Sequence, residues 1–252
     1  NSKIPQIGRY HTLYKKQLKV PKHYKGPTVS LKRAFASSIN PAMGVIGQKL
    51  GGGALEKTSR KLGFNVNFKD SIIEKSNFTP PDSGYALAEV ACGFTQETTI
   101  SPLLAAAISR SIQQEKALEI PHLPLSQKEN FLAKPGNLEI SPLKGNTYKD
   151  LQKLMKATYT SGTARTSLKK EVFSQYRSKI NIGGKTGTLD GKSPKGRYDW
   201  FLGYAENKLD KNNAVIIVVM QVHGKLRTLK STSITGLLIN DWAKNYLRIL
   251  KK

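Results

Sequence analysis

Residues 180–223 read INIGGKTGTLDGKSPKGRYDWFLGYAENKLDKNNAVIIVVMQVH, and this stretch decides the fold. Three parts of it, 180–189, 198–206 and 213–223, are rich in β-branched and aromatic residues. The segments between them are short and rich in Gly, Lys, Pro, Asp and Asn. That pattern is typical of strands joined by tight connections, so we predict a three-stranded antiparallel meander.

An amphipathic helix is expected after the meander, over about residues 232–250. Its apolar residues recur at helical spacing: Ile234, Leu237, Leu238, Trp242, Tyr246, Leu247 and Leu250. A helix with one apolar stripe buries that stripe against another element. We expect this helix to cover one face of the sheet.

Helical patterns dominate the chain before the sheet. Apolar spacing and end signals predict helices over residues 29–38, 41–50, 54–62, 101–112 and 147–161. Asn40 followed by Pro41 reads as a helix cap with Pro in the first turn. Helices that are segregated from a late sheet predict an α/β fold of the α+β type. We expect one domain, 1–252, with a mainly helical subdomain over 28–179 and the sheet plus C-terminal helix over 180–252.

The composition excludes several classes of protein. The chain has 252 residues, one Cys and four scattered His. One Cys cannot form an internal disulfide, and neither residue type is placed to build a metal cluster. We expect no metal and no cofactor, a buried inert thiol at Cys92, and surface positions for His11, His23, His122 and His223.

The formal net charge is +24 and it is unevenly distributed. Residues 1–55 contain ten Lys and Arg and no acid. Such a surface attracts polyanions, of which nucleic acid, anionic lipid and an anionic cell-wall polymer are the candidates. The alternative is that surplus Lys only keeps the protein soluble. No apolar run reaches the roughly 20 residues that a membrane-spanning helix needs.

The segment Gly183-Gly184-Lys185-Thr186-Gly187-Thr188 is the best candidate for chemistry. A Lys, a hydroxyl and flanking Gly on an edge strand would offer a cation, a donor and open backbone to a carboxylate lying alongside. A solvated Lys in a Gly-rich strand is the alternative for this tripeptide alone.

Other segments occur in a fixed order around it: Ser38-Ile39-Asn40 at a helix boundary, Gly162-Thr163-Ala164 after a helix, then GKTGT, then DWFLGY. Together they resemble the transpeptidase domain of penicillin-binding proteins, over nearly the whole chain. The family's signatures are SxxK, an SDN-type motif and KTG. The resemblance implies a penicillin-binding-protein and β-lactamase-like fold.

The resemblance also implies roles for individual residues. Ser38 would relay a proton or hold the network around the nucleophile, and Lys185 would support that network electrostatically. Asn40 would bind the substrate amide. Thr186 and Thr188, with the open backbone at Gly187, would bind the terminal carboxylate, and the Thr188 N–H would supply half of an oxyanion hole.

The implied reaction is acyl transfer on a D-Ala-D-Ala stem peptide of peptidoglycan. β-Lactams would bind the same site, and an anionic cell-wall polymer is a further candidate partner. The implied location is the cell envelope, periplasmic or otherwise extracytoplasmic, with membrane attachment only through a segment outside this sequence.

The nucleophile motif does not occur where the family has it. Residues 1–37 contain no SxxK, and the literal matches at Ser141 and Ser167 lie far downstream of Ser38. The nucleophile is therefore unknown. We expect it upstream of Asn1 in a longer enzyme; the alternative is an inactive relative that binds cell-wall material without acylation.

A nucleic-acid-binding protein is the alternative from another class. The net charge and the basic, aromatic segment from Tyr10 to Lys25 favour it. However, the sequence has no recognised nucleic-acid motif, so no nucleic-acid partner is expected.

Overall fold

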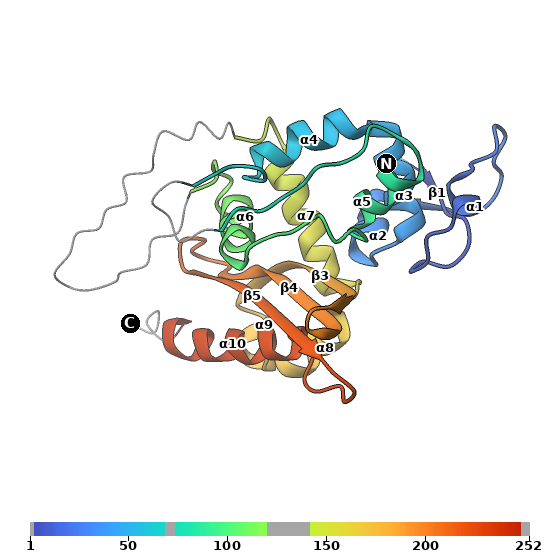
Figure 1. The fold of residues 1–252 in the computed structure, drawn as a ribbon. Coiled ribbons are helices and arrows are strands. Elements are labelled where there is room, and N and C mark those ends of the chain that lie inside the picture. Colours follow the sequence, from blue (N-terminus) through green and yellow to red (C-terminus); the bar gives the residue numbers. More distant parts are fainter. Residues whose placement is uncertain (1–2, 69–73, 120–141, 248–252) are drawn as a thin grey trace.

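A three-stranded antiparallel sheet lies at the centre of the fold (Figure 1). The computed structural model describes residues 3–68, 74–119 and 142–247. The strand order is β3-β4-β5, and the predicted meander is confirmed. The strands are β3 (Ile180–Lys192), β4 (Lys195–Asn207) and β5 (Ala214–His223).

Helices and one small two-stranded ribbon make up the other regular structure of the described residues. The ribbon pairs β1 (Lys3–Pro5) with β2 (Thr28–Ser30). The helices are α1 (Lys15–Leu18), α2 (Leu31–Ala36), α3 (Asn40–Leu50), α4 (Gly52–Lys61), α5 (Gly84–Cys92), α6 (Pro102–Gln114), α7 (Thr147–Thr160), α8 (Arg165–Glu171), α9 (Ser174–Arg177) and α10 (Ser231–Tyr246). None of them is long and apolar enough to cross a bilayer.

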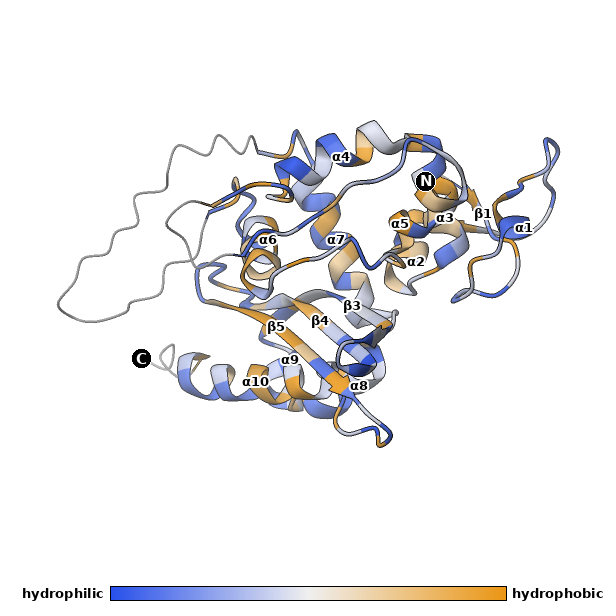
Figure 2. Ribbon diagram, viewed as in Figure 1, coloured by the Kyte–Doolittle hydropathy of each residue, from blue (hydrophilic) through white to orange (hydrophobic). Residues whose placement is uncertain are grey.

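Both faces of the sheet are covered by helices. On one face, Phe201 of β4 belongs to a buried cluster with Leu168 of α8 and Ile239 of α10. On the other face, Tyr204 of β4 packs with residues of α6 and α7, including Met155. Figure 1 shows the sheet between these two helical layers, and Figure 2 shows apolar colouring along β4 and β5 where the layers meet. The expectation that the C-terminal helix covers one face is confirmed.

Helix α10 is rotated relative to the stripe that we predicted. Ile239, Trp242 and Ala243 are buried against the sheet. Leu237 and Leu238, which were expected to cover it, are 49% and 45% exposed. The buried positions follow one another at intervals of three and four, so the helix still buries a single face, shifted around its axis.

The first predicted helix begins later than its apolar pattern indicates. Val29 pairs with Ile4 in the β1–β2 ribbon, where its β-branched side chain packs against the small N-terminal core. The helix α2 follows, and the Ser30 hydroxyl accepts a hydrogen bond from the backbone N–H of Arg33 at 3.2 Å. Ser30 is therefore the N-cap of this helix.

Helix α3 has the predicted length, but Asn40 is not its cap. Ile39 occupies the N-cap position, and Asn40 is the first helical residue. The N–H of Asn40 donates to the Tyr10 carbonyl at 2.8 Å, which holds the helix start against the N-terminal segment. The cap prediction was wrong by one position, since Ile39 rather than Asn40 has the extended backbone of an N-cap residue.

Four helices, α1, α5, α8 and α9, were not predicted. Helix α5 packs so closely on α3 that a Cβ atom on Gly47 would lie 2.3 Å from the Cβ of Ala91. Helix α8 packs with α10 on the sheet. The subdomain boundary at residue 180 stays a prediction, although α8 precedes it and shares the core of the sheet.

Candidate functional site

Lys185 and Ser38 meet although 147 positions separate them in the sequence. Lys185 extends from β3, and Ser38 lies in the turn between α2 and α3. The Lys185 Nζ donates to the Ser38 Oγ at 2.5 Å and to the Thr186 carbonyl at 2.7 Å. The same ammonium lies 5.7 Å from the ring centroid of Phe35, within the range of a cation–π contact. The Lys is therefore held in place rather than solvated.

The backbone at Ser38 has a conformation that favours glycine. Its φ is +49°, in the left-handed region. The turn is fixed by the Ile39 N–H, which donates to the Ala34 carbonyl at 2.9 Å. His11 also contacts it, with Nδ1 at 3.2 Å from the Ser38 carbonyl oxygen. A non-glycine residue stays in this region only where its surroundings impose it, and such residues often lie at functional sites.

Thr186 contacts a third segment, the turn after α7. The hydroxyl oxygens of Thr163 and Thr186 lie 2.5 Å apart. The N–H of Thr163 donates to the Ala36 carbonyl at 3.0 Å, which ties this turn to α2. The fourth segment, 199–204, pairs with the Lys185 segment across β3 and β4. The structure therefore brings together all four segments that we singled out in the sequence.

Burial lowers the pKa of Lys185 to about 8 from its ordinary value of 10.5. Low-dielectric surroundings disfavour the charged ammonium. None of the ion pairs between described residues involves Lys185. About a tenth of the Lys185 amines are then neutral at pH 7 and can accept a proton. A Lys tuned in this way is suited to proton transfer through the Ser38 hydroxyl.

Asn40 lies beside this network, two residues after Ser38. It is half-buried, and its side-chain amide makes no hydrogen bond to another described residue. Its backbone carbonyl accepts from the Cys92 thiol at 3.2 Å. Cys92 is half-buried rather than fully buried as predicted. Desolvation still raises the pKa of its thiol to about 12, so the thiol stays protonated at neutral pH.

Gly187 and Thr188 are exposed on β3, opposite Trp200 and Asp199 of β4. In the described part of the chain, β3 pairs with no strand except β4. Its other edge, beside Lys185, has no strand partner among these residues, and we call it the open edge of β3. The role of these two residues in binding stays a prediction.

Of the two literal SxxK matches, the structure describes the one at Ser167 and not the one at Ser141. Ser167 and Lys170 lie on α8, which packs with α10 on the sheet. No hydrogen bond joins them to Ser38 or Lys185. Ser141 lies outside the described residues. Neither pair therefore joins the Ser38–Lys185 network as the structure describes it.

Sequence reasoning missed part of the site and misplaced one histidine. The contact of His11 with the Ser38 turn has no local signal, because only the tertiary fold brings residues 10–11 there. Of the four histidines expected on the surface, His11 and His23 are exposed and His122 lies outside the described residues. His223 is buried, with Nε2 at 3.7 Å from the Asp199 Oδ2. No group of three His, Cys, Asp or Glu residues that could hold a metal occurs among the described residues.

Comparisons with known proteins agree with this arrangement. A model of the penicillin binding protein transpeptidase domain matches residues 5–239. A search of curated proteins found no match. Among solved structures, PBPA from Mycobacterium tuberculosis has a TM-score of 0.61 at 21% identity, with 89% of this chain and 53% of that chain covered.

Two further solved structures have the same fold. The D,D-transpeptidase domain of a peptidoglycan glycosyltransferase from Eggerthella lenta has a TM-score of 0.62 at 18% identity, and 87% of this chain and 54% of that chain are covered. The Penicillin-Binding Protein (PBP2) from Helicobacter pylori has a TM-score of 0.60 at 20% identity, with 90% and 41% covered. The chain spans about half of these structures or less. Because the family model matches most of the sequence, the chain belongs to the penicillin-binding protein transpeptidase domain family.

Proposed function

We propose that this chain provides the substrate-binding side of a peptidoglycan D,D-transpeptidase-type site. It would hold a D-Ala-D-Ala stem peptide, or a β-lactam, for acyl transfer to a serine. The observation that carries the proposal is the 2.5 Å contact between the Lys185 Nζ and the Ser38 Oγ, at the open edge of β3. A half-buried Lys of lowered pKa beside a hydroxyl is an arrangement suited to acid–base work.

Substrate binding would use the open edge of β3. An extended peptide can lie along such an edge and add main-chain hydrogen bonds. Its terminal carboxylate would be bound by the hydroxyls of Thr186 and Thr188 and by the exposed backbone at Gly187. The Asn40 amide, which makes no bond to another described residue, would bind an amide of the peptide.

The reaction is an acyl transfer in two steps. A serine oxygen attacks the carbonyl carbon of the penultimate D-Ala, and the N–H of Thr188 supplies one donor to the oxyanion. The C–N bond to the terminal D-Ala then breaks, and the leaving nitrogen takes a proton. That proton would be the one that the attacking serine loses: the neutral Lys185 amine would take it up through the Ser38 hydroxyl and then return it through the same hydroxyl to the leaving nitrogen. An amine or water finally releases the acyl group.

The titles of related structures support β-lactams as ligands. Penicillin-binding protein A from M. tuberculosis has been captured as acyl-enzyme complexes with imipenem and with penicillin G. The E. lenta structure is described as a D,D-transpeptidase domain. These likenesses also support a place in the cell envelope, outside the cytoplasm, for this chain.

A second candidate is a relative that binds stem peptides without acylation. The observation that favours it is the place of Ser167 and Lys170, a literal SxxK match on α8 that makes no hydrogen bond to Ser38 or Lys185. The two candidates share the binding site and differ in the covalent step. A test must therefore score binding and acylation separately.

The experiment uses the protein isolated from its own cells. It is treated with a fluorescent penicillin, and the intact mass is measured, followed by peptide mapping. We expect one acyl adduct, on a serine other than Ser38. Stereoselective binding of a D-Ala-D-Ala peptide without an adduct would establish the second candidate. If no adduct forms and the protein does not prefer the D-Ala-D-Ala peptide over its L-Ala-L-Ala isomer, both candidate functions are overturned.

A further inference from the structure

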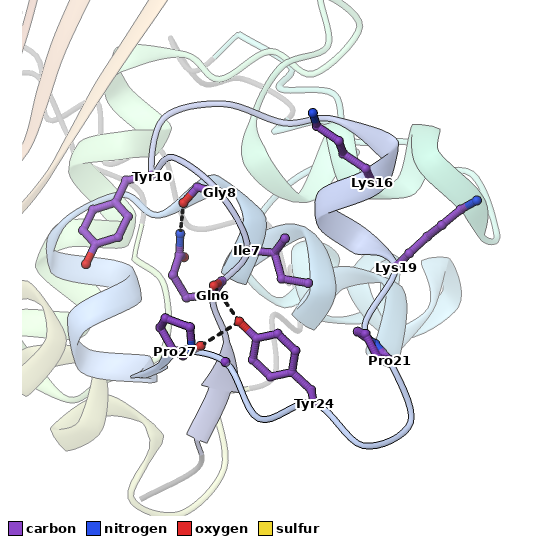
Figure 3. A pocket seen from close by; sticks show the side chains of 10 residues that line it. Gln6, Ile7, Gly8, Tyr10, Lys16, Lys19, Pro21, Tyr24 and Pro27 are labelled. Carbon is purple, nitrogen blue, oxygen red and sulfur yellow. Dashed lines mark hydrogen bonds between the residues drawn. The ribbon is translucent and has the colours of Figure 1, made fainter.

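A pocket apart from the proposed substrate site lies in the N-terminal segment (Figure 3). It is open to solvent and has a volume of about 720 Å³. Tyr10 lines the pocket, and the carbonyl of the same residue accepts the N–H of Asn40 at 2.8 Å. The pocket and the proposed substrate site are therefore built on one continuous piece of backbone.

Three polar side chains hold the pocket in shape. The Gln6 amide donates to the Gly8 carbonyl at 2.7 Å, and the buried Gln17 amide donates to the Ile7 carbonyl at 2.8 Å. The Tyr24 hydroxyl contacts the carbonyls of Gln6 at 2.8 Å and Pro27 at 3.1 Å. These bonds connect the two halves of the segment, so the pocket is formed before a ligand arrives.

The lining combines ring faces with cations. The Tyr24 ring, Ile7 and Pro21 present carbon surfaces. Lys16 of α1 and Lys19, which directly follows this helix, extend on the rim (Figure 3). Because the Tyr24 hydroxyl is already bonded to two carbonyls, the ring offers its face rather than its oxygen. The two ammonium groups project outward in Figure 3, which suits a ligand that crosses the rim better than a small enclosed anion.

The basic side chains around the pocket have no acidic partner among the described residues, although the Lys16 ammonium lies 6.0 Å from the centroid of the Tyr14 ring. Residues 1–55 carry ten basic side chains and no acid. None of the ion pairs between described residues involves one of these ten. The whole segment is therefore a positive surface that attracts an extended anion over a distance of about 10 Å at 0.1 M salt.

We propose that this pocket binds a carboxylate-bearing glycan, the acidic strand of a cell-wall polymer. Saturated sugar rings would pack on Tyr24, Ile7 and the prolines, and the carboxylates would pair with Lys16 and Lys19. The proposal rests on the proposed function, since a polymer bound here would run toward the Asn40 end of the substrate site. Single-stranded nucleic acid fits less well, because successive stacked bases need neighbouring ring platforms and the two lining tyrosines, Tyr10 and Tyr24, lie apart (Figure 3).

The test measures the affinity of the 252-residue chain for a fluorescent oligogalacturonate and for its methyl-esterified form of equal length. These probes share the sugar backbone and differ in charge. The variant Lys16→Gln/Lys19→Gln removes the rim cations. The matched control, Lys169→Gln/Lys170→Gln, removes the same charge from exposed positions on α8.

We expect the rim variant to bind the acidic probe about tenfold more weakly, since charged hydrogen bonds are lost. The α8 control should change the affinity less than about twofold, because it changes only long-range charge. A second pair tests the pocket itself: Ile7→Glu places a repelling charge among the lining residues and should weaken binding more than Ile7→Gln, which has the same size. Circular dichroism confirms that each variant is folded.

Three results would overturn the proposal: equal losses in both double variants, equal binding of the esterified probe, or tighter binding of oligo-dT than of the acidic glycan. Binding of a D-Ala-D-Ala peptide is measured on the same proteins. If that binding is absent while the glycan result holds, the proposed function fails and the pocket remains. If peptide binding holds and the glycan result fails, only the pocket proposal falls.

Discussion

Gly162 packs directly on Ala36, so closely that a Cβ atom at position 162 would lie 2.1 Å from the Ala36 carbonyl oxygen. The N–H of the next residue, Thr163, donates to that same carbonyl. The end of α7 and the end of α2 are thus joined backbone to backbone. This contact sets the distance between the Thr163 hydroxyl and the strand that carries Lys185.

The substitution Gly162→Ala should therefore disturb stability and binding together. The new methyl group meets backbone atoms, which cannot move as a flexible side chain would, so we expect a loss of about 1–3 kcal/mol in the free energy of unfolding. Urea unfolding and affinity for a D-Ala-D-Ala peptide measure the two effects. Gly53→Ala is the control: nothing lies within 4 Å of its Cβ position in α4, and a neutral or stabilising effect is expected there. Equal effects of the two substitutions would contradict the packing argument.

The left-handed backbone at Ser38 predicts different effects for two substitutions. Ser38→Ala and Ser38→Gly both remove the hydroxyl that contacts Lys185, so both should lose peptide binding to the same extent. Glycine adopts a positive φ without steric cost, so the Gly variant should be about 1 kcal/mol more stable than the Ala variant. Thermal unfolding measures this difference. An Ala variant as stable as the Gly variant would show that the turn is not strained.

Much of the fold was predictable because its signals are local. The meander, the start of α6 at Ser101 and the extent of α3 all follow from alternation, caps and glycines within a few residues. Helix α5 was missed because its residues are apolar on more than one side and its place depends on contact with Gly47 of α3. The rotation of α10 could not be predicted either, since Leu237 and Ile239 are equally apolar and only packing selects between them.

The sequence allowed the residues of the site to be predicted from their motifs, but not their backbone conformation or their burial. Ser38, Asn40 and Lys185 were singled out from the order of short segments along the chain. Nothing local indicates that Ser38 has a positive φ, because serine rarely adopts one. The burial that lowers the pKa of Lys185 also depends on α2 and α7, which are distant in sequence from β3.

Lys185 should make the stability of the protein depend on pH. Its folded pKa of about 8 lies below the ordinary value of 10.5, so the unfolded chain binds more protons between these values. The contribution of Lys185 to the free energy of unfolding therefore rises as the pH increases from about 8 to 10.5, by about 3 kcal/mol in total. Lys185→Met removes this contribution. The stability of the wild type relative to the Met variant should increase from pH 7 to pH 10 in urea unfolding.

Lys156→Met is the control for that pH series. Lys156 is exposed, and its only hydrogen bond to a described residue, 3.5 Å to Asn181, is long. The stability of this variant should change in parallel with the wild type across the same pH range. If the free energy of unfolding of Lys185→Met also changes with pH in parallel with that of the wild type, Lys185 is not desolvated in the folded protein.

The hydroxyl pair of Thr163 and Thr186 can be tested by a double-mutant cycle. Thr163→Val and Thr186→Val each keep the side-chain volume and remove one hydroxyl, leaving the other without its 2.5 Å partner. If the two hydroxyls act as a unit on the substrate carboxylate, the double variant should bind a D-Ala-D-Ala peptide no more weakly than Thr186→Val alone. The expected coupling is about 1 kcal/mol, measured by calorimetry. Thr186→Ser, which keeps the hydroxyl, should retain most of the affinity. Additive losses would show that Thr163 does not act through Thr186, and the contact would then be only a structural one.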